Sequence, residues 1–596
     1  MVRGYRRLTG AVVSVAVAGT LAAGSLVTST GAVAAPASSE TGQYLVFYAQ
    51  GRQAGALGAI RAGGGTADAV DTKLGYVIAR GPAKGFAERL GASTSVVGVT
   101  DNRRIGSAAA LPAGDRASVP TAPISVGEAA MPAAWSSSAE ALAPAAGASG
   151  VSASSTDSTD STAASADMAS ARGGDPLSGR QWDMKMIGAT PTGSYAKERG
   201  SKKVLVGIID TGVDGKHPDI APNFNRALSR NFVVDRPKDS KGKTLDGPCE
   251  YKGCKDPVDV DDDGHGTHVA STIGSPLNGI GVAGVAPNVS LVNIRAGSDS
   301  GFFFLKPVLD ALTYAGDAGI DVVNMSFFVD PWTFNCARNP ADSRAEQLQQ
   351  SGIITGVQRA LDYARKHGVT LISALGNGST DLGNPTTDKD SPGYPVGSER
   401  ERSIDNSCLN VPAESRGVIS VSAVGPSKNK AWYSDYGIEQ TDLSAPGGDP
   451  ADAGTSLKGT AREILAAAPT GALRKQKLID SSGKPTSSSV IRECHQGKCA
   501  YYQYLSGTSM ASPHATGVAA ILISRFGKPG KGGLTLSPAR VEELLYATAT
   551  PTGCPSSGST TYSVSEETHV CAGPKSKNGF YGHGLVDAYR AATTKG

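Results

Sequence analysis

The chain has 596 residues, 39% of them hydrophobic, with 75 glycines and 34 prolines, so we expect at least one large globular domain, many turns and some low-complexity chain. Its formal net charge is only +3, and no block of Lys or Arg stands beyond the first residues. This argues against the strongly basic surface of a nucleic-acid-binding protein.

The N-terminus predicts a secretory signal peptide over residues 1–34. Three arginines in positions 3–7 precede an apolar run over about 11–27, and Ala32-Val33-Ala34 fits a small-x-small cleavage site before Ala35. A membrane anchor is the alternative, but polar residues and glycines interrupt the run, which is short for a bilayer span. We therefore expect a secreted, extracellular protein without membrane contact after signal removal.

Residues 35–106 are predicted to form a small α+β module. Strand-like and helix-like runs alternate there, with strands expected at 44–48, 76–79 and 95–99 and helices at 54–61 and 84–90. Residues 107–174 are built mainly from Ala, Ser, Thr, Gly and Pro, which cannot bury enough apolar surface to define one structure. We predict that they form a protease-sensitive linker.

Residues 175–596 are predicted to form one large domain. Short apolar runs bounded by turn residues recur at 204–209, 291–294, 322–325, 369–374 and 418–424, and helical stretches such as 308–315 and 357–366 lie between them. This alternation predicts an α/β fold with a mainly parallel sheet and helices on both faces. In such sheets, ligands bind beyond the carboxyl ends of the strands.

Asp210 is the first candidate for a functional residue. It follows an apolar strand that includes Val206 and precedes Thr211-Gly212, so its carboxylate would lie at the strand's carboxyl end. A buried acid in this place can orient a histidine. An Asp there is also common as a turn residue or a helix cap, and the motif alone leaves both interpretations open.

Two histidines, His265 and His268, follow the acidic stretch 259–263. A zinc-protease helix requires His at i and i+4 with a Glu between them, which is absent. An EF-hand loop matches the opening Asp pattern, but Ala270 stands where the closing Glu is required. The remaining interpretation is a general base, His265, on a turn flanked by glycines, with His268 as a packed structural residue.

Ser509 is the candidate nucleophile. Pro513 is tolerated only in a first helical turn, so the helix should begin near Ser509 and place that hydroxyl at its positive end. A helix cap is the alternative role, and Ser512, inside the first turn, is the competing hydroxyl. Asn377 follows the run 369–374 and Gly376, and it is either a turn residue or an oxyanion donor.

Together these segments resemble the subtilisin-like serine proteases. The motifs occur in the family's chain order of Asp, His, Asn and Ser: Asp210-Thr-Gly, Gly264-His-Gly-Thr-His-Val-Ala, Gly376-Asn and Gly507-Thr-Ser-Met-Ala-Ser-Pro-His. Further stretches at 281–287, 321–326 and 443–447 agree. The resemblance covers about residues 180–590, and the module within 35–106 is similar to the family's propeptide.

This resemblance implies a serine endopeptidase that hydrolyses peptide bonds through an acyl-enzyme intermediate. Ser509 would be the nucleophile and His265 the base that takes its proton. Asp210 would orient the imidazole and stabilise its charged form. Asn377 and the Ser509 amide would hold the oxyanion of the tetrahedral intermediate.

The resemblance also predicts where substrates bind. An extended protein or peptide substrate would pair with backbone near Ser300-Gly301 and near Ser326. Phe327 and Phe328 replace the family's usual Leu-Gly, so these rings would narrow or reshape the specificity pocket.

For cofactors and partners, the resemblance implies no cofactor in the chemistry. Structural calcium is common in the family, but the loop 276–280 is short for its usual site, and a solvated acidic loop is the simpler interpretation of 259–263. The module would act as an intramolecular inhibitor that helps the domain to fold. We expect a mature monomer that acts on proteins or peptides and binds no nucleic acid.

Eight cysteines suit an oxidising compartment. Spacing favours the local disulfides Cys249–Cys254, Cys494–Cys499 and Cys554–Cys571, which leave Cys336 to pair with Cys408. Zinc binding is the alternative, but it would favour CxxC pairs, which these spacings do not provide.

Two other functions compete with a protease. A non-catalytic scaffold of the same fold would be expected to lack one of the four site residues, and all four positions are filled. A lipase-like α/β-hydrolase would carry its serine in Gly-x-Ser-x-Gly and in the order Ser, Asp, His. Here the serine comes last and lies in Gly-Thr-Ser-Met-Ala.

Overall fold

The computed structural model describes residues 41–102, 174–495 and 497–595. The expected signal peptide and nearly all of the expected linker therefore lie outside the described residues. Within the described part of the chain, no helix combines the length and apolar character needed to cross a bilayer.

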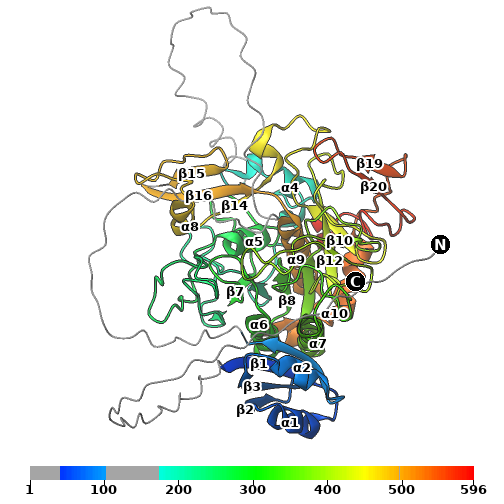
Figure 1. The fold of residues 1–596 in the computed structure, drawn as a ribbon. Coiled ribbons are helices and arrows are strands. Elements are labelled where there is room, and N and C mark those ends of the chain that lie inside the picture. The colour runs from blue at the N-terminus through cyan, green and yellow to red at the C-terminus, as the bar shows by residue number, and fades with distance from the viewer. Residues whose placement is uncertain (1–40, 103–173, 496, 596) are drawn as a thin grey trace, which may run out of the picture. The chain divides into compact units, whose positions relative to one another are not determined.

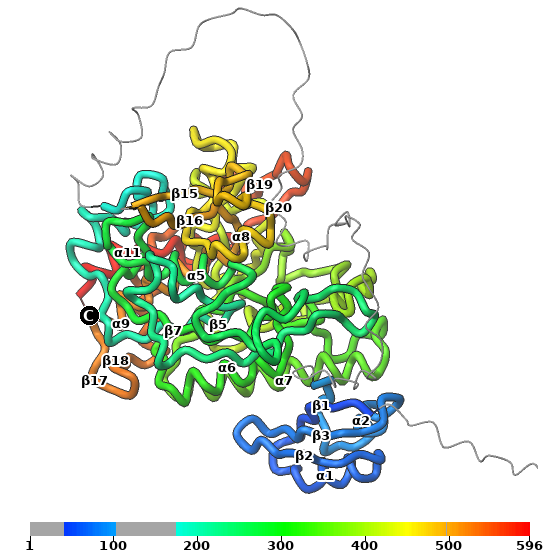
Figure 2. The backbone as a smooth tube through the Cα atoms, turned by 90° about the vertical axis from the view of Figure 1, so that its left-hand side faces the viewer, coloured from blue at the N-terminus to red at the C-terminus, as the bar shows by residue number. Residues whose placement is uncertain are grey.

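A seven-stranded sheet forms the centre of the large domain (Figures 1 and 2). Its strand order is β13-β12-β9-β8-β5-β7-β6, and every neighbouring pair is parallel. The strands are β5 (Leu205–Ile209), β6 (Arg230–Asn231), β7 (Ser290–Arg295), β8 (Val322–Met325), β9 (Thr370–Ala374), β12 (Ile419–Val424) and β13 (Leu443–Pro446). The parallel α/β sheet expected from the sequence is confirmed.

Helices cover both faces of this sheet. Side chains along a strand alternate between the two faces, so each strand contributes to the packing on both. Val206 and Ile208 of β5 pack in the cluster that includes α5 (His265–Gly274) and α9 (Thr508–Phe526). Leu205 and Ile209 pack in the cluster that includes α6 (Leu305–Ala318) and α7 (Arg344–Lys366). All five residues of β5 are buried, so its continuous apolar run is typical of a central parallel strand.

Shorter elements surround this core. The helices are η1 (Ser178–Arg180), α4 (Trp182–Met186), η2 (Ser194–Ala196), η3 (Gly459–Arg462), α8 (Thr470–Lys475), α10 (Pro538–Thr548) and α11 (Ala588–Thr593). Small antiparallel sheets are formed by β10 (Thr387–Asp388) with β11 (Arg402–Ser403), by β14 (Ile464–Ala467) and β15 (Val490–His495) with β16 (Lys498–Leu505), by β17 (Lys528–Gly530) with β18 (Gly533–Thr535), and by β19 (Ser559–Thr561) with β20 (Thr568–Val570).

The N-terminal module is an antiparallel sheet in the order β2-β3-β1-β4 with two helices. Its elements are β1 (Thr41–Tyr48), α1 (Gln53–Ala62), β2 (Thr66–Asp71), β3 (Tyr76–Pro82), α2 (Phe86–Gly91) and β4 (Val96–Asp101). Sequence analysis missed β2. Five of its six residues are exposed, so this edge strand has no apolar alternation that could reveal it.

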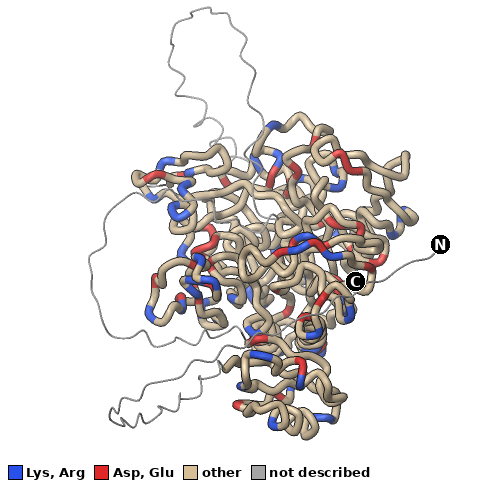
Figure 3. The backbone as a smooth tube through the Cα atoms, in the orientation of Figure 1, with Lys and Arg blue, Asp and Glu red and all other residues tan. Residues whose placement is uncertain are grey.

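Acidic and basic residues are interspersed along the chain (Figure 3). This distribution agrees with the small net charge.

Four disulfides join the pairs expected from spacing, Cys249–Cys254, Cys336–Cys408, Cys494–Cys499 and Cys554–Cys571. Three of them close local loops. Cys336–Cys408 instead spans 72 residues, and both of its cysteines are buried.

We expect the long-range disulfide to stabilise the fold most. The loop-entropy relation assigns roughly 4 kcal/mol to a 72-residue loop and roughly 2 kcal/mol to a five-residue loop. Guanidinium unfolding of the mature protein should therefore show a larger loss for Cys336→Ser/Cys408→Ser than for the matched pair Cys249→Ser/Cys254→Ser. Equal losses, or free thiols at these positions in the untreated protein, would contradict the assignment.

Candidate active site

The expected site residues gather at the carboxyl edge of the sheet. Asp210 directly follows β5, Ser326 follows β8, and Asn377 lies three residues beyond the end of β9 at Ala374. In the sheet, β7 lies on one side of β5 and β8 lies on the other. This edge is therefore a topological switch point, where α/β proteins bind their ligands.

Asp210 and His265 are hydrogen-bonded and buried. Nδ1 of His265 lies 2.7 Å from Oδ1 of Asp210, and the amide of Thr211 donates to the same oxygen at 2.8 Å. Burial alone would lower the pKa of His265, but the charge and hydrogen bond of Asp210, with smaller contributions from Asp263 and Asp261, raise it above the ordinary 6.5. The imidazole is thus oriented by the carboxylate and made a stronger base.

Asp261 builds the turn that presents His265, and sequence analysis missed this role. Its carboxylate accepts hydrogen bonds from the Gly264 amide at 2.9 Å and from the amide and hydroxyl of Thr267 at 2.9 and 2.6 Å. Gly264 has a left-handed φ of 106°, which favours glycine. A buried Asp four residues before a histidine carries no sequence signal that distinguishes it from its acidic neighbours.

Ser509 is the second residue of α9 and is buried. Pro513 has no amide hydrogen for the Ser509 carbonyl four residues earlier, and the hydroxyl of Ser326 donates to that carbonyl instead, at 3.1 Å. The same Ser326 hydroxyl lies 2.9 Å from Oγ of Ser512. The hydroxyl of Ser512, the competing candidate, is therefore bonded to a buried side chain near the first turn of α9. Helix α9 packs against α5, the helix that begins at His265.

Two amide donors converge beside Gly507. Oδ1 of Asn377 accepts from the amide and the hydroxyl of Thr508 at 2.9 and 2.8 Å, which directs its Nδ2 away from them. A Cβ built on Gly507 would lie 3.5 Å from Nδ2 of Asn377 and 3.6 Å from the amide nitrogen of Ser509. An oxyanion between these two donors could accept hydrogen bonds from both.

The expected substrate residues occupy two neighbouring segments. Ser300 and Gly301 lie in a tight turn, in which the Gly301 amide donates to Ser298 at 3.0 Å and the Ser300 amide donates to Asp246 at 3.1 Å. Both amides are thus used within the protein, and only carbonyl groups of this pair are left to pair with a peptide. The carbonyl of Ser326 lies 3.5 Å from Oγ of Ser509.

The two phenylalanines after Ser326 have different surroundings. Phe327 is buried and stacks on Phe303, with ring centroids 4.2 Å apart and planes 4° apart. Phe328 is half-buried. Of the two rings, that of Phe328 is therefore the one that remains partly accessible.

His268 has the packed position expected for it. Its Nε2 donates to the carbonyls of Ile464 and Gln503, both at 3.0 Å. Burial, followed by the charge of His265, lowers its pKa to about 3. The imidazole is therefore neutral and holds β14 and β16 against α5.

The acidic residues near the site are mostly held by the protein's own cations. Asp235, Asp256 and Asp299 converge on the buried guanidinium of Arg295, and Asp259 pairs with Lys216 and Arg226. These carboxylates fit an internal ion-pair cluster better than a metal site.

Hydrogen bonds within the protein hold the short loop 276–280 and its neighbours, where the resemblance suggested calcium. Asp219 accepts from the Val282 amide at 2.9 Å and the Tyr502 hydroxyl at 3.1 Å. Gly279 donates to Asp175 at 2.7 Å. Protein donors thus bind one oxygen of each carboxylate, Oδ2 of Asp219 and Oδ1 of Asp175. No step of the chemistry is assigned to a metal.

Residues 201–584 match the model of the subtilase family, Peptidase_S8. The chain belongs to the subtilase family. Subtilisin DY from Bacillus licheniformis is 28% identical over 350 residues, which cover 59% of this chain and 85% of the relative. Thermitase from Thermoactinomyces vulgaris is 26% identical over 355 residues, with 59% and 85% covered.

Among solved structures, the epidermin leader peptide processing serine protease EpiP from Staphylococcus aureus is similar in fold. Its TM-score is 0.55 at 21% identity, and the match covers 94% of this chain and 100% of that chain. The chain of 596 residues, as a subtilase, is a serine protease that acts on peptide bonds. Subtilases need no cofactor for that chemistry.

Proposed function

We propose that this subtilase is a secreted serine endopeptidase whose catalytic triad is Asp210, His265 and Ser509. The observation that carries the proposal is the 2.7 Å bond between Asp210 and His265 at the start of α5, next to the helix whose second residue is Ser509. The donors of Asn377 and Ser509 that meet beside Gly507 support an oxyanion hole at the same place.

In this mechanism, Oγ of Ser509 attacks the carbonyl carbon of the scissile peptide bond. Nε2 of His265 takes the hydroxyl proton, and Asp210 stabilises the imidazolium through Nδ1. The carbonyl oxygen becomes an oxyanion held by Asn377 Nδ2 and the Ser509 amide. The imidazolium then protonates the leaving amine, and water hydrolyses the acyl-enzyme by the same steps with His265 again as base.

A casein or peptide digestion with the mature protein tests this function. We expect hydrolysis that a fluorophosphonate stops in proportion to covalent labelling. A peptide-binding protein without hydrolysis would indicate a non-catalytic scaffold. Hydrolysis of esters alone would indicate a lipase-like enzyme.

Asn377→Ala should lower kcat by a factor of roughly 10²–10³ and leave KM nearly unchanged, because the donor is needed mainly in the transition state. Steady-state kinetics on a peptide substrate measure both constants. Asn384→Ala is a matched control, because that exposed amide in the same loop donates only to Asp381. A larger change in KM than in kcat would contradict the oxyanion role.

We also propose that the N-terminal module is a propeptide that inhibits the enzyme until it is removed. The guanidinium of Arg359 on α7 donates to the module's carbonyls at Tyr48, Leu74 and Gly75, over 2.9–3.0 Å. A Cβ on Gly98 of β4 would lie 2.4 Å from the Cα of Gly352 on α7, so strand and helix backbones meet closely. These contacts support a module that fits this face of the domain.

The predicted signal peptide and the four disulfides support secretion to an oxidising compartment. We propose that the mature enzyme is an extracellular monomer that acts on proteins or peptides. Removal of the module should fall between about Asn102 and Asp175, where the sequence is rich in small and polar residues.

A further inference from the structure

The space proposed for an extended substrate lies between the turn at Ser300-Gly301 and the segment Ser326–Phe328, and we call it the substrate path. Just beyond it, the two flanking segments pair with each other. Phe304 and Asp330 are paired through their backbones as in parallel strands, and the Asp330 amide donates to the Phe303 carbonyl at 2.9 Å. Paired strands lie only about 4.8 Å apart, so no third strand can continue between them past this point.

An aromatic cluster fills the same end of the substrate path. Phe302 and Phe304 are parallel, with ring centroids 5.8 Å apart, and Tyr394 meets both rings edge-on at 5.8 and 5.1 Å. All three are buried, and Leu245 and Val396 pack against them. We call these five residues the aromatic plug.

Two loops from distant parts of the sequence meet at the plug. The hairpin 236–246 sends the ammonium of Lys241 to the hydroxyl of Ser398 at 2.6 Å and that of Lys243 to the carbonyl of Val396 at 3.2 Å. The same hairpin holds the turn of the substrate path, because Asp246 accepts from the amide of Ser300. The hairpin and the 390–400 loop therefore form a bridge across this end.

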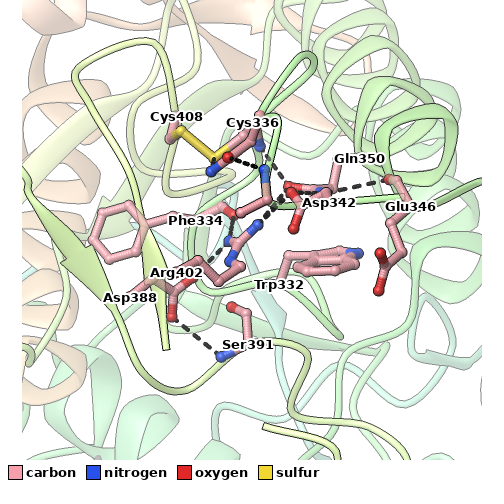
Figure 4. Close-up of polar contacts among 12 residues, drawn as sticks. Trp332, Phe334, Cys336, Asp342, Glu346, Gln350, Asp388, Ser391, Arg402 and Cys408 are labelled. Atoms are coloured by element: carbon pink, nitrogen blue, oxygen red, sulfur yellow. Dashed lines mark hydrogen bonds and ion pairs between the residues drawn. A yellow bond between two sulfur atoms is a disulfide. The ribbon is translucent and has the colours of Figure 1, made fainter. Parts of the chain in front are cut away.

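The 390–400 loop is anchored from below. The buried guanidinium of Arg402 donates to Asp342 at 2.7 Å and to Asp388 at 2.6 Å and lies 4.7 Å from the centre of the Trp332 ring (Figure 4). The Asp388 carboxylate in turn accepts from the amide of Ser391, at the start of the loop, at 3.1 Å (Figure 4). The 390–400 loop of the bridge is thus held by a buried ion-pair cluster, near which the Cys336–Cys408 disulfide also lies (Figure 4).

We propose that the aromatic plug and its bridge end the substrate path after about three residues on the N-terminal side of the scissile bond. This rests on the proposed function. Ser326 lies beside Ser509, and the chain from Ser326 to Asp330 leads away from it. A peptide paired antiparallel to this segment would run toward Ser509, so its N-terminal residues would meet the plug. At about 3.3 Å per residue, the length from Ser326 to Phe328 takes about three residues.

The enzyme should therefore gain little from substrate residues beyond about the third on the N-terminal side of the scissile bond. A longer chain must bend out of the substrate path before the plug, and its further residues add no strand pairing. The specificity would differ from that of an open cleft, in which each further residue adds backbone hydrogen bonds.

Peptides of one to six residues, each with the same C-terminal residue and a fluorogenic amide leaving group, test this length limit on the mature enzyme. We expect kcat/KM to rise up to about three residues and then to change by less than about threefold. A further rise of tenfold or more from three to six residues would overturn the proposal. No hydrolysis of any peptide, together with no fluorophosphonate labelling, would instead overturn the proposed function on which it rests.

Two variants address the bridge directly. Tyr394→Ala removes the central ring of the plug, and Lys241→Ala/Lys243→Ala removes exposed contacts of the bridge without changing the core. Either change should loosen the packing that holds the Phe304–Asp330 pairing, so in at least one variant the six-residue peptide should gain tenfold or more over the three-residue peptide relative to wild type. Lys185→Ala is the matched control, because this exposed lysine also donates to a backbone carbonyl. Unchanged length profiles in both variants would overturn the role of the plug.

Discussion

Ser509→Ala should abolish peptide hydrolysis and fluorophosphonate labelling while the fold remains intact. The amide nitrogen of Ser509 is one of the two donors close to Gly507, and replacement of its side chain removes a hydroxyl without leaving a large cavity. Loss of the nucleophile of a triad typically lowers kcat by a factor of about 10⁶. Peptide hydrolysis, labelling and circular dichroism of the purified variant give the three readouts.

Ser512→Ala is the matched control for this prediction. Its hydroxyl is bonded to Ser326 in the core, so we expect a small loss of stability with labelling preserved. We further expect the enzyme to cut off its own module, so Ser509→Ala protein should keep residues 41–102 attached, as N-terminal sequencing would detect. Substantial labelling of the Ser509→Ala protein, or its normal processing after purification, would contradict these assignments.

Asp210→Asn should lower kcat by a factor of about 10⁴, because an amide can no longer orient the imidazole or stabilise its charged form. It should also move the pH dependence. His265 acts as a base only when neutral, so the activity of the wild type falls as the pH drops through its raised pKa. Without the Asp210 carboxylate, burial dominates and lowers that pKa, so the acid limb of kcat/KM should move to lower pH.

The matched control for this charge effect is Asp263→Asn. Asp263 also raises the pKa of His265, but through a weaker influence than Asp210, and it contacts the backbone amide rather than the ring. We expect a small shift of the acid limb and little loss of kcat. Equal effects of the two substitutions, measured as pH profiles of kcat/KM, would contradict the distinct role of Asp210.

The elements that could be predicted are those with a strong local pattern. The five apolar runs of the large domain correspond to β5, β7, β8, β9 and β12, and every boundary agrees within one residue. Helix α7 was expected only from residue 357, whereas it begins at Arg344. Its first half contains three glutamines, and a capping box at Ser343 with Glu346 starts it. The Ser-x-x-Glu spacing of that box is visible in the sequence.

The contacts that shape the site depend on residues far apart in the chain. Neither the bond between Asn377 and Thr508 nor the support of the Ser509 carbonyl by Ser326 follows from local sequence. The sequence showed two unusual phenylalanines at 327 and 328, but periodicity could not tell that Phe327 is buried and Phe328 half-buried. The bridge over the substrate path joins residues 241 and 398, and no local pattern reveals such a contact.

The subtilase match and the proposed plug concern different properties of the enzyme, namely the reaction and the access of substrates. The subtilase match covers residues 201–584 and accounts for the chemistry, whereas the buried cluster of Phe302, Phe304 and Tyr394 is proposed to limit access to it. Substrate choice should therefore depend on the plug and the bridge more than on the triad.

The most direct test of the central claim is mass spectrometry of the mature enzyme after reaction with a fluorophosphonate. We expect one adduct per active molecule, located on Ser509 in the peptide that contains Gly507-Thr508-Ser509, and a loss of peptide hydrolysis proportional to the adduct. An adduct on another residue, or full hydrolysis by protein whose Ser509 is modified, would contradict the account.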